Sequence, residues 1–457
     1  MPARVRGSGE RQCAPRALGA TWLVAALLLV GSGARAQSPE AIAAHAGQAA
    51  GDSALPNRVV GYFAQWSHHD GYRLRDLVDN GSAARLTHLH YAFGNVRDDR
   101  CEVGVQQAFD AATGAGGDAR ADYARSYAAA DSVDGIADAP TQALRGYWNQ
   151  LRKLKRQYPR LKVLVSLGGW TLSRGFSSAA RPEHRRAFVA SCIDAYIRGN
   201  LPLFEGAGGD GAAAGVFDGI DIDWEFPGSC GLSCGTPGDS ANFTALLAEF
   251  RRQLDAVRPG LLLGAAVGAG LDQIRATEPA RYQPSLDYIN VMAYGYHGPD
   301  EPLTNFHAAL YAAPGDPAGG AARRFDVHDS IQALLAAGAP RRKLVLGIAA
   351  HGRGWRGVPD RDDGLYQPGT PAPGSLGPGI ERYRVLRALP FPRHANRSAR
   401  ARWIYDGDTF WSFDDPSTVA AKMAYVRAQG LGGGFLWEFG SDDAQGALLH
   451  AIADGLH

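Results

Sequence analysis

Short runs of apolar and β-branched residues alternate with amphipathic helical patterns from residue 58 to the end of the chain. Runs of this kind are typical of strands buried on both faces of a parallel sheet. They predict strands at residues 58–63, 86–94, 162–167, 217–225, 261–267, 286–293, 343–349 and 433–438. The intervening periodicity predicts helices, most clearly at residues 147–158, 182–198, 240–257, 327–337 and 418–429.

Eight successive strand–helix units favour a closed (β/α)8 barrel of the α/β class. A doubly wound open sheet is the alternative, but no glycine-rich dinucleotide turn follows the first predicted strand. Two segments are too long for simple connections: residues 97–142 after the second strand, and residues 356–414 between the seventh strand and its helix. We expect the second to form a small α+β insertion. Both would extend from the edge of the barrel at which active sites are built.

The charge balance argues against two classes of partner. The 457 residues contain 47 lysines and arginines and 46 aspartates and glutamates, for a net charge of +1. No basic cluster is interleaved with aromatic residues. We therefore expect no nucleic acid partner and no electrostatic attraction to an anionic membrane surface.

The first 36 residues have the organisation of a secretory signal peptide. Arginines between Arg4 and Arg16 precede an apolar run at residues 17–30 and the small-residue site Ala34-Arg35-Ala36. The run is shorter than the roughly 20 residues that span a bilayer, although an uncleaved anchor is the alternative. We expect cleavage near Ala36, a short leader at residues 37–56, a barrel domain at residues 57–457, and a secreted mature protein without a membrane segment.

Four carboxylates lie within eight residues that otherwise have the character of a buried strand, Asp218-Gly-Ile-Asp-Ile-Asp-Trp-Glu225. Asp221, Asp223 and Glu225 alternate with apolar residues, so they should share one face at spacings of about 7 Å. Like charges this close in a partly desolvated site cannot all be ionised, and at least one pKa must rise. A carboxyl group of raised pKa can donate a proton near neutral pH. A solvated edge strand is the alternative interpretation.

The cysteines suggest disulfides and no zinc site. Cleavage of the signal peptide would remove Cys13 and leave four cysteines. Cys230 and Cys234 lie in a Gly/Ser-rich turn and could form a small disulfide loop in an oxidising compartment. Cys101 and Cys192 remain as a possible second pair that sequence alone leaves open. No histidine or further cysteine flanks Cys230 and Cys234 at ligand spacing, so we expect no metal.

The pattern Asp218-x-x-Asp221-x-Asp223-x-Glu225 resembles the signature of glycoside hydrolase family 18, the chitinases and their relatives. Further motifs resemble the family's other strands in the correct order: Gly61-Tyr62-Phe63, Tyr91-Ala92-Phe93, Ser166-Leu-Gly-Gly-Trp170, Met292-Ala293-Tyr294, Gly352-Arg353-Gly354-Trp355 and Gly432-Gly433…Trp437-Glu438. The resemblance covers nearly the whole predicted mature chain and is greatest to exported bacterial chitinases that carry an α+β insertion after the seventh strand.

The resemblance implies endo-acting hydrolysis of β-1,4-N-acetylglucosamine linkages in chitin and chitooligosaccharides, without a cofactor and by a monomer. This family is an exception to the two-carboxylate rule, since the substrate's acetamido group acts as nucleophile and the configuration is retained. Glu225 would be the general acid. Asp223 would orient the acetamido group, and Asp221 would share a proton with Asp223.

The other site residues also follow from the resemblance. Tyr294 would hold the acetamido oxygen, Tyr62 and Ser166 would hydrogen-bond Asp221, and Trp437 would form the floor beneath the reactive sugar. The remaining substrate-binding residues would be Phe93, Trp170, Met292 and Arg353. For Asp218 we expect a structural role, because its position in the alternation differs from that of the other three carboxylates.

The chain departs from the family pattern at two positions. Gly295 stands where the family's M-x-Y-D motif has aspartate, and His351 stands where tyrosine usually precedes the arginine by two residues. Arg353 would therefore lose its usual partner, and Asp300 or Glu301 could replace it. We expect weaker or altered binding on the leaving-group side, with the acid machinery intact.

Two other functions are alternatives within the same fold. An endo-β-N-acetylglucosaminidase acting on N-glycans is one, but the insertion after the seventh strand argues for a deep cleft that suits a linear polymer. A non-catalytic chitin-binding lectin is the other. Such relatives typically lose the acid, whereas Glu225 is present.

Overall fold

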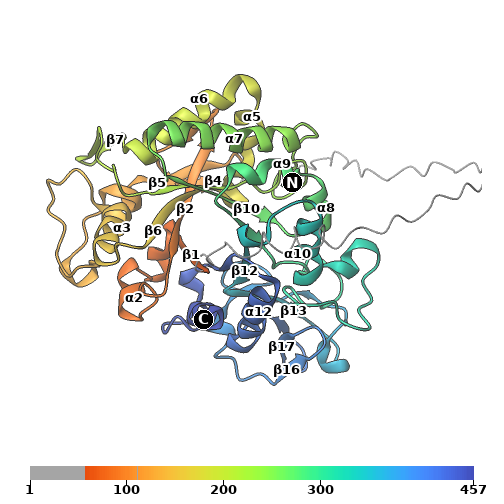
Figure 1. Cartoon of the computed structure of the whole chain (residues 1–457). Coiled ribbons are helices and arrows are strands. Elements are labelled where there is room, and N and C mark those ends of the chain that lie inside the picture. Colours follow the sequence, from red (N-terminus) through yellow and green to blue (C-terminus); the bar gives the residue numbers. More distant parts are fainter. Residues whose placement is uncertain (1–56, 111) are drawn as a thin grey trace, which may run out of the picture. The chain divides into compact units, whose positions relative to one another are not determined.

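The barrel consists of eight parallel strands in a computed structural model that describes residues 57–110 and 112–457. The strands are β1 (Arg58–Ala64), β2 (His88–Arg97), β6 (Lys162–Gly168), β9 (Gly219–Asp223), β10 (Leu262–Gly268), β11 (Tyr288–Met292), β12 (Leu344–Ala349) and β19 (Gly433–Trp437). They pair in the order β1-β19-β12-β11-β10-β9-β6-β2, and β1 also pairs with β2 (Figure 1). The predicted (β/α)8 barrel is thus confirmed. The predicted signal peptide and leader lie outside the described residues.

The predicted helices form outside the sheet. They are α3 (Gly146–Gln157), α6 (Pro182–Cys192), α7 (Asp239–Val257), α10 (Val327–Ala336) and α12 (Pro416–Gln429), with α13 (Ala447–Leu456) completing the chain. The Asp415 carboxylate caps α12 by accepting from the N–H groups of Ser417 and Thr418. The helix predicted at residues 182–198 ends at Cys192 and continues as a π-helical turn, Ile193–Arg198. Among the described residues, no helix combines the length and apolar character that a membrane span needs.

Two apolar clusters organise the barrel. Side chains on the outer face of the strands pack against the helices, as Ile220 and Ile222 of β9 do. The inner face carries a smaller cluster that includes Tyr62, Phe93 and Phe435, with Trp437 packed against it. The buried polar residues Asp221 and Ser166 lie on the inner face beside Tyr62, which is where a reaction site can be built.

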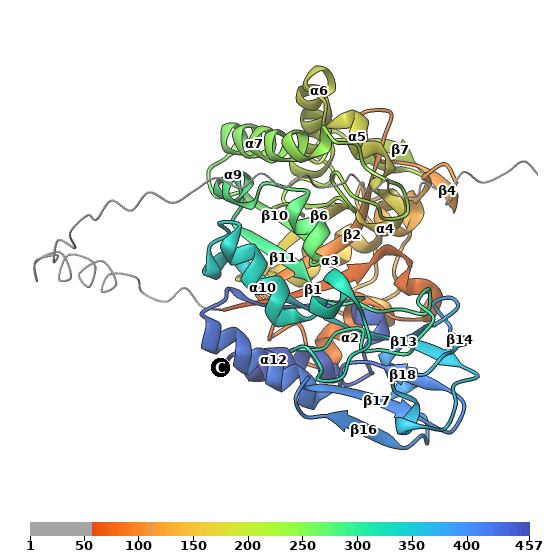
Figure 2. The same cartoon turned by 90° about the vertical axis from the view of Figure 1, so that its right-hand side faces the viewer.

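The insertion after β12 contains a second sheet. Its strands are β13 (His351–Arg356), β14 (Thr370–Pro371), β15 (Ile380–Arg382), β16 (Arg393–Asn396), β17 (Ala401–Tyr405) and β18 (Phe410–Ser412), which lie beside the barrel in Figure 2. Trp355, Trp403 and Phe410 are buried within this insertion and form part of its own core. The sheet begins at His351, earlier than residue 356, because β13 leaves the barrel soon after Ala349 to pair with β18.

The segment after β2 is anchored by a disulfide. Strand β3 (Arg100–Glu102) pairs antiparallel with β2, and a hairpin of β4 (Gln106–Asp110) and β5 (Ala115–Asp118) follows. Cys101 in β3 is bonded to Cys192 at the end of α6, with a Cα–Cα distance of 4.9 Å. Cys230 is bonded to Cys234. The structure thus joins both cysteine pairs that the sequence left open.

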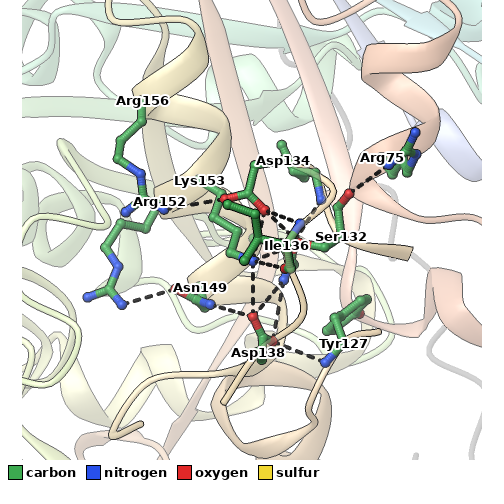
Figure 3. Close-up of polar contacts among 12 residues, drawn as sticks. Arg75, Tyr127, Ser132, Asp134, Ile136, Asp138, Asn149, Arg152, Lys153 and Arg156 are labelled. Carbon is green, nitrogen blue, oxygen red and sulfur yellow. Dashed lines mark hydrogen bonds and ion pairs between the residues drawn. The ribbon is translucent and has the colours of Figure 1, made fainter. Parts of the chain in front are cut away.

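A buried cation holds the second half of the same segment. The Lys153 ammonium on α3 lies 3.0 Å from Asp134 Oδ1 and 3.2 Å from Asp138 Oδ1 (Figure 3). It also donates to Ser132 Oγ and to the Ile136 carbonyl. The Asp138 side chain is fully buried and accepts from Tyr127 N and Asn149 Nδ2 as well. One side chain therefore ties residues 132–138 to the helix.

Candidate functional site

The carboxylate row lies at the carboxyl edge of the barrel, but Glu225 stands outside the strand. β9 ends at Asp223, so the expectation that Glu225 is its last residue is wrong. The neighbouring strands explain the end of β9: Asp223 pairs with Gly168, the last residue of β6, and with Ala266 of β10. Glu225 follows in a bend and is partly exposed, and its N–H donates to Ser173 Oγ over 2.9 Å. Glu225 is therefore placed at the mouth of the barrel.

Asp221 lies fully buried at the inner end of the row. Its Oδ2 accepts hydrogen bonds from Tyr62 OH at 3.0 Å and from Ser166 Oγ at 2.8 Å. These are the two partners that the family resemblance implied. Gly264 of β10 leaves room for this carboxylate, since a Cβ atom there would lie 2.7 Å from Asp221 Oδ1. Asp221 Oδ1 has no hydrogen-bond partner among the described residues.

Asp223 and Glu225 are protonated more readily than ordinary carboxyl groups. Burial raises the pKa of Asp223 well above its usual range, and the negative charges of Glu225 and Asp221 raise it further. Burial also raises the pKa of Glu225 to about 8. Asp223 Oδ1 lacks a hydrogen-bond partner, as Asp221 Oδ1 does. A proton held between the two aspartates would satisfy both atoms, and Glu225 can act as an acid near neutral pH.

Aromatic side chains surround the row. Trp437 stacks with Phe93 at a centroid distance of 5.4 Å and contacts Tyr62 edge-on at 5.5 Å. Tyr294 and Met292 pack against the same inner cluster. Burial, followed by the charges of Asp223 and Glu225, raises the pKa of Tyr294 well above its usual range, so its hydroxyl remains a proton donor. The arrangement provides an apolar floor with hydrogen-bond donors at its edge, which is typical of sites that bind small molecules.

Two tryptophans extend this aromatic surface. Trp66, on the short helix after β1, lies 6.4 Å from the Trp437 ring and is 38% exposed. Trp170, after β6, is 51% exposed. The Cys230–Cys234 loop lies against Trp170, because a Cβ atom at Gly231 would be 3.4 Å from its ring. Both indoles are open to a ligand that follows the surface.

Asp218 faces away from the row. Its Oδ2 lies 2.9 Å from the Lys155 ammonium of α3 and accepts from Val163 N at 2.9 Å. These contacts join the start of β9 to β6 and to α3. They leave Asp218 no contact with Asp221, Asp223 or Glu225 among the hydrogen bonds of the described residues.

Arg353 and two histidines lie after the strands β11 and β12, and the His351 ring lies 6.1 Å from that of Tyr294. Burial lowers the pKa of Arg353, and the charge of Asp300 opposes this change, whereas Glu301 pairs with His297 at 2.8 Å. Asp300 is therefore the carboxylate that acts on Arg353. Burial lowers the pKa of His351 to about 3, so its imidazole is neutral. Gly295 has a φ of +68°, and the atom closest to a Cβ built there is Arg353 Nη2 at 3.8 Å.

A cavity of about 590 Å³ lies beside the aromatic floor and shares Trp66 and Phe93 with it. Asp122 lies in its wall and accepts from Tyr91 OH and Gln65 Nε2; burial raises the pKa of this carboxyl to about 7. The cavity does not reach Asp221, Asp223 or Glu225. It lies between β2 and the β4–β5 hairpin.

One group among the described residues could hold a metal ion. His68, His69 and Asp118 place their ligand atoms within 4.8 Å of one another, and His68 Nδ1 lies 3.0 Å from the Gln65 carbonyl oxygen. The adjacent residues His68 and His69 do not have the sequence spacing of metal ligands, and only the fold brings Asp118 close to them. The group stands at the wall of the cavity and apart from the carboxylate row.

Sequence reasoning missed three residues at the site. His90 and Asn290 reach the row from β2 and β11, and Asn290 Nδ2 donates to Tyr62 OH over 2.9 Å. Trp66 joins the aromatic surface from the helix after β1. Strand alternation was the available signal for the first two, because each is a polar residue at an inward position of an otherwise apolar strand.

Comparisons with known proteins agree on one family. The model of the family described as "Glycosyl hydrolases family 18" matches residues 58–442. The chain is 38% identical over 397 residues to "Chitinase C" of Streptomyces lividans, covering 85% of this chain and 58% of that protein. It is 36% identical over 422 residues to "Chitinase 63" of Streptomyces plicatus, covering 89% of this chain and 62% of that protein. The chain therefore spans about three fifths of the length of these relatives.

Solved structures show the same likeness. The catalytic domain of psychrophilic chitinase B from Arthrobacter TAD20 superposes with a TM-score of 0.82 at 42% identity, covering 87% of this chain and 95% of that one. An N-acetylglucosaminidase from Paenibacillus barengoltzii gives a TM-score of 0.66 at 30% identity, covering 87% and 99%.

Proposed function

Because the chain belongs to glycosyl hydrolases family 18, we propose that it hydrolyses β-1,4-linked N-acetylglucosamine in chitin and chitooligosaccharides, with Glu225 as general acid. The observation that carries the proposal is the graded row of carboxyl groups. Asp221 is held by donors, the pKa of Asp223 is raised well above its usual range, and that of Glu225 is raised to about 8.

The row suits a reaction in which the substrate supplies the nucleophile. Glu225 protonates the glycosidic oxygen, and the bond to the anomeric carbon breaks as the carbonyl oxygen of the 2-acetamido group attacks that carbon. The intermediate is an oxazolinium ion. Water then attacks its anomeric carbon, the bond to the acetamido oxygen breaks, the water proton passes to the Glu225 carboxylate, and the released sugar has retained configuration. Asp223 accepts from the acetamido N–H and stabilises its positive charge, while Asp221 takes up the proton that Asp223 gives up.

The remaining site residues position the sugar. Tyr294 donates to the acetamido oxygen, and Trp437 supports the sugar ring from below. Trp66 and Trp170, both exposed, offer flat surfaces to neighbouring sugars along a linear chain. The sheet β13–β18 forms a wall beside the barrel, which suits an extended polymer and endo action.

Purified protein incubated with chitin oligosaccharides and with an N-glycosylated protein tests the proposal. We expect cleavage of the oligosaccharides, with proton NMR showing that the β-anomer forms first. Release of N-glycans without oligosaccharide cleavage would favour the endo-β-N-acetylglucosaminidase, and binding of chitin without cleavage would favour the lectin.

Export is part of the proposal. The organisation of residues 4–36 predicts a signal peptide, and two disulfides within the barrel domain are typical of proteins in an oxidising compartment.

The pH dependence of the reaction should follow Glu225. Because burial raises its pKa from 4.5 to about 8, the carboxyl keeps its proton through neutral pH and loses it as pH rises through about 8. We expect kcat/KM on a soluble oligosaccharide to fall tenfold per pH unit above that value. A decline that begins near pH 5 would contradict the assignment.

Restoring aspartate at position 295 should strengthen leaving-group binding. A carboxylate there would reach the Arg353 guanidinium, since a Cβ atom at Gly295 lies 3.8 Å from Nη2. We expect Gly295→Asp to lower the KM for chitooligosaccharides several-fold, with kcat within about threefold of wild type, or to shift the cleavage pattern. Gly295→Asn is the matched control, since it carries the same cost of a positive φ without the charge. Unchanged KM and cleavage pattern in the aspartate variant would contradict the role of this position.

A further inference from the structure

Asp221 has a third close polar neighbour, His90, besides its hydrogen-bond donors Tyr62 and Ser166. His90 Nδ1 lies 3.2 Å from Asp221 Oδ2, the same oxygen that accepts from Tyr62 and Ser166. Both side chains are fully buried. The contact has ion-pair distance but not hydrogen-bond geometry, since Nδ1 has no hydrogen-bond partner among the described residues.

Register and ring contacts fix the position of His90. On β2, His90 pairs with Tyr62 of β1 and with Leu164 of β6. The imidazole contacts the Tyr62 ring edge-on at 4.7 Å, and its Nε2 lies 2.7 Å from Tyr288 OH on β11. The imidazole thus bridges the Asp221 carboxylate and a phenol across the barrel interior.

The chemistry of these neighbours determines where the ring carries hydrogen. A nitrogen lone pair 3.2 Å from a carboxylate oxygen would be repelled, so this contact favours a proton on Nδ1. Burial and the charge of Asp221 raise the pKa of Tyr288 well above its usual range, so this hydroxyl stays protonated and can donate to Nε2. The tautomer of His90 is therefore set by its two partners.

Other titratable groups around His90 are few. His88, two residues earlier on β2, has a pKa lowered to about 3 by burial and then by His90, and so is neutral. Tyr62 stays protonated, because burial and the charges of Asp221 and Asp223 raise its pKa. Beyond Tyr288 lie Arg58, 5.2 Å from the centre of the Tyr288 ring, and Asp287. Asp221 is the only carboxylate that His90 contacts among the described residues.

We propose that His90 is a positioning residue that keeps Asp221 ionised and thereby directs the shared proton of the row to Asp223. The inference rests on the proposed function and names a further residue for that site. Tyr62 and Ser166 donate to Oδ2 and His90 Nδ1 lies 3.2 Å from it, whereas Oδ1 has no hydrogen-bond partner among the described residues. A protonated Asp223 can donate to Asp221 Oδ1. Asp223 is then protonated before the reaction and can pass this proton on when the acetamido group binds.

Loss of the imidazole should therefore shift the acidic limb of the pH profile of kcat and not only lower kcat itself. Without the Nδ1 proton, the ionised form of Asp221 is less stable, and the pair Asp221–Asp223 takes up a second proton more readily. The doubly protonated pair cannot accept the proton that catalysis requires. The acidic limb of the kcat profile should move to higher pH, while the alkaline limb set by Glu225 should stay.

The test compares His90→Leu with His90→Asn, whose amide can restore a donor to Asp221. For His90→Leu we expect kcat on a chitooligosaccharide to fall about tenfold or more, KM to stay within twofold, and the acidic limb to rise by about one pH unit. His90→Asn should recover most of the rate and return the limb toward wild type. Tyr288→Phe should show a smaller change in the same direction. Circular dichroism and thermal unfolding establish that each variant is folded.

Two results would overturn the proposal. One is a folded His90→Leu enzyme with a lower kcat and limbs that superimpose on those of wild type, which would indicate packing alone. The other is ¹⁵N-histidine NMR of the wild-type protein showing His90 with hydrogen on Nε2 and none on Nδ1. The NMR measurement needs no substrate, so it tests His90 even if wild-type protein proves inactive on chitooligosaccharides, which would refute the proposed function instead.

Discussion

Replacing Glu225 with glutamine is expected to lower kcat on chitooligosaccharides by about a hundredfold or more. The amide keeps the size and hydrogen-bonding capacity of the side chain but cannot donate a proton to the leaving oxygen. The oxazolinium ion then has to form with an unprotonated leaving group. Because the contacts with the sugar remain, KM should change much less than kcat.

Stability separates this effect from a folding defect. The wild-type carboxyl has a pKa of about 8 in the fold and 4.5 as an ordinary group, so folding must bind a proton at neutral pH. Stability from this group is fully present below pH 4.5 and is lost as pH rises through about 8. The Glu225→Gln variant lacks this dependence, and its unfolding midpoint at pH 7 should equal or exceed that of wild type.

A second carboxylate of the same motif supplies the matched control. Asp218→Asn removes a charge three residues before Asp221, at a position that faces Lys155 and Val163 N. We expect kcat within about threefold of wild type. Glu225→Gln with a kcat within tenfold of wild type would refute the assigned acid.

Replacing Lys153 with methionine is expected to lower the free energy of unfolding by about 3–5 kcal/mol. The Lys153 ammonium lies between Asp134 and Asp138, and the Asp138 side chain is fully buried. Methionine fills a similar volume but leaves the Asp138 carboxylate without a cation and removes the donor to the Ile136 carbonyl. Chemical denaturation of both proteins in urea measures the difference.

The same helix supplies a control for charge. Arg156 lies 3.8 Å from Asp134 and its side chain is 61% exposed, so Arg156→Met should cost less than about 1 kcal/mol. Adding Asp138→Asn to Lys153→Met should recover part of the loss, because the amide carries no charge that needs a cation. An equal loss of unfolding free energy in Lys153→Met and Arg156→Met would contradict the role of the buried ion pair.

The sequence predicted the barrel because each strand has a recognisable local pattern of residues. An apolar, β-branched run flanked by polar helical patterns admits few other structures, and the predicted strands begin within two residues of the observed ones. The predicted ends of strands were less accurate where a neighbouring strand determines the end. β9 stops at Asp223 because β6 offers no pairing residue beyond Gly168, and no local pattern reports the length of a neighbouring strand.

The family resemblance identified Glu225, Asp223 and Asp221, together with Tyr62 and Ser166, because these residues stand in short, ordered motifs. His90, Asn290 and Trp66 do not. Strand register brings His90 and Asn290 to the row, and the short helix after β1 brings Trp66 to the aromatic surface. Likewise, the sequence left open whether Asp300 or Glu301 acts on Arg353. In the structure Glu301 pairs with His297, and the charge of Asp300 is the one that raises the pKa of Arg353.

By itself the sequence determined that three carboxyl groups share one apolar strand region, and hence that the pKa of at least one must rise. Alternation along a strand is a local property, and the repulsion between neighbouring charges follows from it. Only the tertiary structure decided how the three carboxyl groups differ. It brings donors from β1 and β6, together with the His90 imidazole of β2, to one oxygen of Asp221, and it leaves Glu225 at the mouth of the barrel, where burial raises its pKa.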